Sequence, residues 1–167
     1  VIVSIFINPT QFGDDEDFET YPQTQKSDIT LISEAGGDAA FIPNVSEMYP
    51  RGFSTKVSVI GLTNMLCGAS RPGHFDGVTQ VVAKLLNQVS ADMAFFGEKD
   101  WQQLTIIKRL VRDLDIPTKI VNVATVRDEF GLALSSRNSY LKSSQLEIAR
   151  KLSSVLQMTA YNIASGG

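Results

Sequence analysis

The strongest chemical signal in the chain is the run Gly97-Glu98-Lys99-Asp100, which follows an apolar segment and leads into a helical pattern. Gly97 lets a backbone come close to a ligand, and the start of the helix favours an anion. Lys99 adds a positive charge for a phosphate, while Glu98 or Asp100 could hold a divalent cation. The run is equally typical of an ordinary capped surface turn, so alone it does not decide between the two.

A second polar segment, Asn8-Pro9-Thr10-Gln11, follows the apolar residues at the start of the chain. The amides of Asn8 and Gln11 offer both donor and acceptor atoms, which suits the hydroxyl and carboxylate groups of a small polar ligand. The alternative is a turn capped by Asn8, which this segment alone favours.

Two loops carry the other candidate groups. Residues 65–75 combine small residues with Arg71, which can pair with a carboxylate or phosphate, and with His74, the only histidine. A helix cap remains the commoner role for a histidine placed like His74. Residues 131–138 offer two hydroxyls and a guanidinium that could fold onto a triphosphate, although a serine-rich surface turn has the same composition.

Alternating strands and helices are expected to position these segments. The predicted strands are residues 1–7, 39–42, 53–60, 93–96 and 118–123, and the predicted helices are residues 28–35, 75–88, 102–114 and 144–163. Residues 1–7 and 93–96 read as strands buried on both faces, and residues 53–60 as a half-exposed strand. This order predicts an α/β fold with a parallel sheet, in which ligands bind at the carboxyl ends of the strands.

The composition excludes several classes of function. The chain has 167 residues and a formal net charge of −3, with no basic block, so nucleic acid is not an expected partner. The apolar runs are far shorter than the roughly 20 residues of a membrane span, so no membrane partner is expected. A single cysteine, Cys67, forms no internal disulfide and is typical of a reducing cytosol. An inert thiol is a commoner role for it than a nucleophile.

Taken together, the segments resemble the pantothenate synthetase (pantoate:β-alanine ligase) family of the nucleotidyltransferase superfamily, in order and along the whole chain. The matching strings include Ile-Asn-Pro-Thr-Gln-Phe at 7–12, Cys-Gly-Ala-Ser-Arg-Pro-Gly-His-Phe at 67–75, Phe-Phe-Gly-Glu-Lys-Asp-Trp-Gln-Gln at 95–103 and Leu-Ser-Ser-Arg-Asn at 134–138. The resemblance implies a Rossmann-like nucleotide and pantoate domain over residues 1–124 and the start of a smaller C-terminal lid over residues 125–167. It also implies a cytoplasmic homodimer.

The resemblance further implies a two-step reaction. ATP and pantoate form pantoyl adenylate with release of pyrophosphate, and β-alanine then attacks the acyl carbon to give pantothenate and AMP, with Mg²⁺ accompanying ATP. By resemblance, pantoate is assigned to Gln11 and Gln103 with support from Asn8 and Tyr21, and β-alanine to Gln11. ATP is assigned to Gly97, Glu98, Lys99, Asp100, Val126, Leu134, Ser135, Ser136 and Arg137. Among these Lys99, Ser135 and Arg137 are the expected catalytic residues, and Asp100 is the expected Mg²⁺ ligand. The family commonly has Met where this chain has Leu134, a volume-conserving difference.

One family motif is absent from the chain. The string His-x-Gly-His, which holds the family's catalytic histidine, does not occur, and Arg71-Pro-Gly-His74 lies in a different loop. We therefore expect the motif upstream of Val1 and much of the lid downstream of Gly167, and we expect this piece alone not to complete the reaction. Two alternatives stay open. One is a non-catalytic pantoate-binding or dimerisation remnant, and the other is a different adenylate-forming enzyme of the superfamily.

Overall fold

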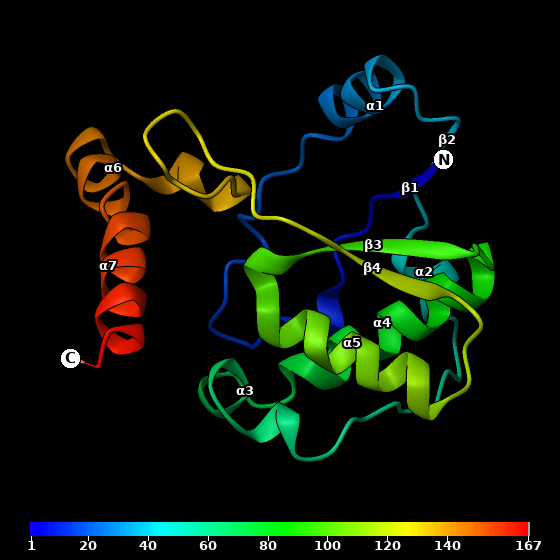
Figure 1. The fold of residues 1–167 in the computed structure, drawn as a ribbon. Coiled ribbons are helices and arrows are strands. Elements are labelled where there is room, and N and C mark those ends of the chain that lie inside the picture. The colour runs from blue at the N-terminus through cyan, green and yellow to red at the C-terminus, as the bar shows by residue number, and fades with distance from the viewer. Residues whose placement is uncertain (167) are drawn as a thin grey trace. The chain divides into compact units, whose positions relative to one another are not determined.

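The computed structural model describes residues 1–166, and the chain divides into two compact units, Val1–Asn122 and Val123–Gly167 (Figure 1). The N-terminal unit contains all four strands in the described part of the chain, the last of which, β4, reaches the boundary. The described residues of the C-terminal unit contain the last residue of β4, a loop with an isolated bridge between Arg127 and Ala133, and then helices. Each unit is described by itself.

The strands of the N-terminal unit form two pairs. β1 (Ile2–Ser4) pairs in parallel with β2 (Ala39–Phe41), with Ile2 opposite Ala39, and α1 (Gln25–Glu34) lies between them in the chain. β3 (Met93–Gly97) pairs with β4 (Lys119–Val123), and α5 (Trp101–Asp113) connects them. The β-helix-β connections confirm the predicted α/β class.

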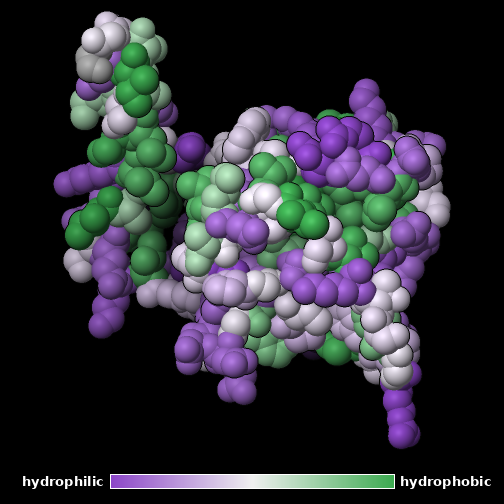
Figure 2. Space-filling model, turned by 90° about the horizontal axis from the view of Figure 1, so that it is seen from below, coloured by the Kyte–Doolittle hydropathy of each residue, from purple (hydrophilic) through white to green (hydrophobic). Residues whose placement is uncertain are grey.

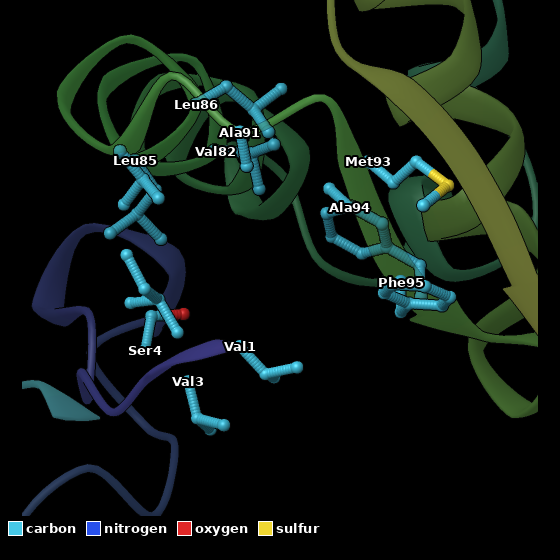
Figure 3. A pocket seen from close by; sticks show the side chains of 13 residues that line it. Val1, Val3, Ser4, Val82, Leu85, Leu86, Ala91, Met93, Ala94 and Phe95 are labelled. Carbon is cyan, nitrogen blue, oxygen red and sulfur yellow. The ribbon is translucent and has the colours of Figure 1, made fainter. Parts of the chain in front are cut away.

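An apolar groove of about 400 Å³ separates β1 from β3 and is closed on one side by α4 (His74–Val89) (Figure 3). The groove explains why the prediction of strands buried on both faces was wrong. Val1 is 78% exposed and Phe95 is 61% exposed, and both line the groove. Residues along β1 and β3 alternate between exposed and half-buried, so one face of each strand is open. The strand predicted over residues 1–7 is correspondingly short and ends at Ser4.

The core lies between the β3–β4 pair and two amphipathic helices. Figure 1 shows α4 and α5 side by side beneath β3, and Ala94 and Phe96 of that strand pack against the cluster of buried side chains to which both helices contribute. The fully buried side chains include Val78 on α4 and Ile106, Ile107 and Leu110 on α5. These residues follow the helical spacing of the sequence, so packing on a sheet confirms the two long helix predictions.

Short helices complete the N-terminal unit. They are η1 (Pro9–Gln11), α2 (Val45–Met48), η2 (Leu62–Asn64), α3 (Cys67–Ser70) and η3 (Glu98–Asp100). The strand predicted over residues 53–60 does not form. Instead, side chains of α4 satisfy the backbone of Val57: its N–H donates to Gln80 Oε1 at 3.0 Å, and its carbonyl accepts from Thr79 Oγ1 at 2.6 Å. The segment therefore lies along a helix and needs no partner strand.

The C-terminal unit contains η4 (Ser136–Tyr140), α6 (Ser143–Ala149) and α7 (Leu152–Ala164). The single helix predicted over residues 144–163 is broken at Arg150 and Lys151. The guanidinium of Arg150 lies 3.7 Å from the ring centroid of Phe130, and its Nε lies 3.7 Å from Asp128 Oδ2, so the loop before η4 anchors the break. Exposed apolar side chains run along α7 and are visible as a green surface in Figure 2. Among the described residues, no helix is both long enough and apolar enough to cross a bilayer.

Candidate functional site

A cavity of about 560 Å³ lies at the carboxyl end of β3. One wall comes from η3 and the first turn of α5 and carries Lys99, Asp100 and Gln103. The opposite wall comes from residues 62–75 and carries Arg71 and His74. The cavity therefore occupies the place in an α/β sheet where ligands bind, and it unites two of the segments singled out in the sequence.

The strand-to-helix turn is open toward solvent on its ligand side. A Cβ atom added to Gly97 would meet no atom within 4 Å, and Lys99 and Asp100 are exposed. Glu98 is held by Asn122, whose Nδ2 donates to Glu98 Oε1 at 3.1 Å. Among the described residues, no acidic side chain pairs with the ammonium of Lys99, so its charge is available to an anion.

Asn8 connects η1 to the rest of the N-terminal unit and is only 2% exposed. Its Oδ1 accepts from Thr10 Oγ1 at 2.9 Å and from Tyr49 OH at 2.8 Å. Its Nδ2 donates to the Gly77 carbonyl at 3.0 Å and to Gln11 Oε1 at 3.2 Å. The protein thus uses the whole hydrogen-bonding capacity of this amide, which suits it to orient Gln11 rather than to touch a ligand. Sequence reasoning missed Tyr49, because it lies 41 residues from Asn8; burial raises the pKa of its hydroxyl.

Arg71 and His74 hold the backbone of Gln11. Arg71 makes a two-pronged ion pair with Glu16, in which its Nε donates to Oε1 at 2.6 Å and its Nη2 donates to Oε2. The hydrogen bond from Arg71 lowers the pKa of Glu16. His74 Nε2 lies 3.1 Å from Arg71 Nη1 and must be the acceptor, because a guanidinium only donates. His74 Nδ1 then carries the proton and donates to the Gln11 carbonyl at 2.8 Å. Sequence reasoning also missed Glu16, for which no local signal existed.

The remaining N-terminal candidates lie close to this network. Gln103 is half-buried in the first turn of α5 and lines the cavity. Tyr21 packs edge-on against Phe12, with ring centroids 5.9 Å apart. Phe12 is the residue that follows Gln11 in the chain. The structure therefore places Lys99, Asp100 and Gln103 in one cavity and links Gln11 to that cavity through Arg71 and His74.

The other candidates belong to the C-terminal unit and form a folded loop of their own. Leu134 N donates to the Val126 carbonyl at 3.0 Å, which brings these two exposed apolar residues together. Ser135 Oγ accepts from Arg137 N at 3.3 Å and so caps η4, where Ser136 and Arg137 begin the helix. The hydroxyls and the guanidinium predicted for a triphosphate are thus presented on one short, exposed helical turn.

The described residues contain no group of three or more His, Cys, Asp or Glu side chains that could hold a metal ion. A Mg²⁺ that is bound mainly through nucleotide phosphates and water needs only one or two protein carboxylates. The exposed carboxylate of Asp100 beside Lys99 fits that requirement, and a site formed by protein ligands alone does not.

Comparison with known proteins identifies the family. The model of the family described as Pantoate-beta-alanine ligase matches residues 1–165. The pantothenate synthetase of Dinoroseobacter shibae is 57% identical over 99% of this chain and 59% of its own length, and that of Moorella thermoacetica is 55% identical over 99% and 59%. The chain thus spans 59% of the length of these curated relatives.

Solved structures agree with the sequence relatives. A crystal structure of pantothenate synthetase from Thermus thermophilus superimposes with a TM-score of 0.96 at 49% identity and covers 99% of this chain and 60% of that one. Pantoate-beta-alanine ligase from Francisella tularensis, complexed with beta-gamma ATP and beta-alanine, gives a TM-score of 0.87 at 43% identity, over 93% of this chain and 60% of that one. Sequence and fold therefore place the chain in the pantoate-beta-alanine ligase family.

Proposed function

We propose that this chain carries the pantoate and nucleotide sites of an ATP-dependent ligase that joins pantoate to β-alanine through pantoyl adenylate. The observation that carries the proposal is the cavity at the end of β3, which brings Lys99, Asp100 and Gln103 together in a member of this family. The family relative complexed with beta-gamma ATP and beta-alanine supports the two substrates.

The first step needs charge neutralisation and alignment but no protein nucleophile. A carboxylate oxygen of pantoate attacks the α-phosphorus of ATP, the bond to the β-phosphate breaks, and pyrophosphate leaves. Lys99 neutralises the phosphates, while the amides of Gln11 and Gln103 hold pantoate. The fixed proton of His74 and the buried amide of Asn8 keep Gln11 in one orientation.

In the second step, the β-alanine amine attacks the acyl carbon, and the bond to AMP breaks to give pantothenate. We assign β-alanine to Gln11, whose backbone carbonyl is hydrogen-bonded to His74. Ser135 and Arg137 complete the proposal as the groups that stabilise the departing pyrophosphate in the first step. Val126, Leu134 and Ser136 line the nucleotide beside them, as Gly97 and Glu98 do at the end of β3.

Asp100 is the residue we assign to Mg²⁺, which when bound supplies additional positive charge at the ATP phosphates. We also propose that the protein works as a cytoplasmic homodimer, on the strength of the family resemblance. The exposed free thiol of Cys67 supports a reducing compartment.

Isothermal titration calorimetry tests the proposal directly. We expect the chain to bind both ATP and pantoate, and Lys99→Met to weaken ATP binding selectively. If the chain binds pantoate but does not bind ATP, the result would support a pantoate-binding remnant instead. Binding of other short hydroxy acids in preference to pantoate would support a different adenylate-forming enzyme.

A further inference from the structure

The turn that begins α3 has an unusual backbone at Leu66. This residue has φ 50° and ψ −123°, and Gly68 N donates to the Met65 carbonyl at 2.9 Å. A type II′ turn places its first central residue at φ of about +60° and ψ of about −120°, a conformation that normally requires glycine. Leu66 therefore occupies a glycine position, and the surrounding structure must hold it there.

The side chain of Gln102 supplies that restraint. Its Nε2 donates to the carbonyls of Leu62 at 2.9 Å and Met65 at 2.7 Å, and its Oε1 accepts from Cys67 N at 3.0 Å. These bonds use both amide hydrogens and the carbonyl oxygen, so no other side chain of this length reproduces them. The bonds also enclose Leu66, since they fix the backbone on either side of it.

The three hydrogen bonds of the Gln102 side chain, called the clamp below, join the two walls of the cavity. Gln102 lies in the first turn of α5, next to Gln103 and three residues after Lys99, whereas Leu62, Leu66 and Cys67 line the cavity from the opposite side. The position of that wall relative to Lys99 and Gln103 is thus set by one side chain.

We propose that Gln102 is a positioning residue, which fixes the wall formed by residues 62–67 at the distance from Lys99 and Gln103 that the ligand requires. The proposal rests on the proposed function for the identity of the ligands, pantoate and ATP. The side chain of Leu66 is 74% exposed and lines the cavity. It stays there because the clamp holds the backbone of Leu66 at a positive φ, which the residue would otherwise leave.

The test compares Gln102→Met, which keeps the length of the side chain and removes all three hydrogen bonds, with Val111→Ala on the same helix. Val111 packs against the core and does not line the cavity, so its truncation is the control for a purely structural loss of stability. Hydrogen exchange of the Cys67 amide, followed by NMR, reports the clamp without any ligand. Calorimetry with pantoate and with ATP, at a temperature where every variant is folded, reports the position of the wall.

We expect Gln102→Met to speed exchange of the Cys67 amide by about tenfold or more and to weaken pantoate or ATP binding by about tenfold, while Val111→Ala lowers Tm and changes neither. Adding Leu66→Gly to Gln102→Met should restore part of the protection of the Gly68 amide, whose bond to the Met65 carbonyl closes this turn, because glycine adopts the turn without restraint. Unchanged Cys67 exchange in Gln102→Met, or affinities within twofold of the unsubstituted chain, would overturn the proposal. If the unsubstituted chain binds neither ligand, the proposed function fails, and the exchange data alone decide whether Gln102 holds the wall.

Discussion

The side-chain amide of Asn8 donates to the carbonyl of Gly77 at 3.0 Å, across 69 residues of sequence. This bond ties η1 to the first turns of α4 at a point where the two backbones nearly touch. A Cβ atom at position 77 would lie 2.3 Å from the carbonyl oxygen of Thr10 and 2.6 Å from the amide nitrogen of Gln11. Gln11 is therefore placed by direct backbone contact with α4 as well as by the Asn8 side chain.

Gly77→Ala tests this close approach. The added methyl group would clash with backbone atoms of Thr10 and Gln11, which cannot move without breaking the Asn8 network. We expect a loss of about 2–3 kcal/mol in the free energy of unfolding, measured by urea denaturation, despite the better helix propensity of alanine. Gly97→Ala is the matched control, since its methyl group would meet no atom within 4 Å and should change the free energy by less than about 0.5 kcal/mol. Equal stability of the two variants would contradict the close contact.

The parts of the fold that the sequence predicts are those fixed by local periodicity. The apolar spacing predicted helices at 75–88 and 102–114, and the structure has His74–Val89 and Trp101–Asp113. The strand predicted over residues 53–60 is wrong because Thr79 and Gln80, more than twenty residues away, satisfy the backbone of Val57. Such a contact leaves no trace in the alternation of the segment itself.

The candidate site follows the same division. Lys99, Asp100 and Gln103 were predictable because they follow a strand in a recognisable string, and the structure places them in one cavity. Tyr49 and Glu16 were not predictable, since their roles depend on partners 41 and 55 residues away. Long-range hydrogen bonds of this kind arise only when the fold brings the segments together.

The ion pair between Glu16 and Arg71 predicts a pH dependence of stability. Its hydrogen bond from Arg71 lowers the pKa of Glu16 in the folded chain below that in the unfolded chain. In the acid range the unfolded state therefore binds more protons at Glu16 than the folded state does. The contribution of the ion pair to the free energy of unfolding is complete at neutral pH, and it is lost as the pH falls through the lowered pKa of Glu16 in the folded chain.

We expect Glu16→Gln to lower Tm at pH 7, and we expect this effect to shrink as the pH falls through the lowered pKa of Glu16 in the folded chain, because the carboxylate of the unsubstituted chain then becomes protonated. Thermal unfolding followed by circular dichroism, from pH 7 down into the acid range, measures the difference. A Tm difference that stays constant over the range would show that Glu16 contributes through packing and not through its charge.

Lys99→Met tests the charge at the end of β3. Removing a cation that faces a phosphate should weaken ATP binding by about tenfold and leave pantoate binding within about twofold. The loss should shrink at high salt, because exposed charges are screened. Lys108→Met, on the exposed face of α5 and outside the cavity, is the control and should change neither affinity. An equal loss of ATP binding in both variants would show that general charge, not the position of Lys99, attracts the nucleotide.

The single cysteine provides a probe of the cavity that needs no substitution. Cys67 is exposed and lines the same cavity as Lys99 and Gln103, on the opposite wall. A ligand that fills the cavity should shield the thiol, so saturating ATP together with pantoate should slow its alkylation by N-ethylmaleimide about fivefold or more, while free tyrosine at the same concentration should not. Mass spectrometry of the intact chain over time measures the rate, because only one site can react. If calorimetry shows that the ligands bind but the alkylation rate does not change, their site lies away from this cavity. Lys99 and Gln103 would then need a different role.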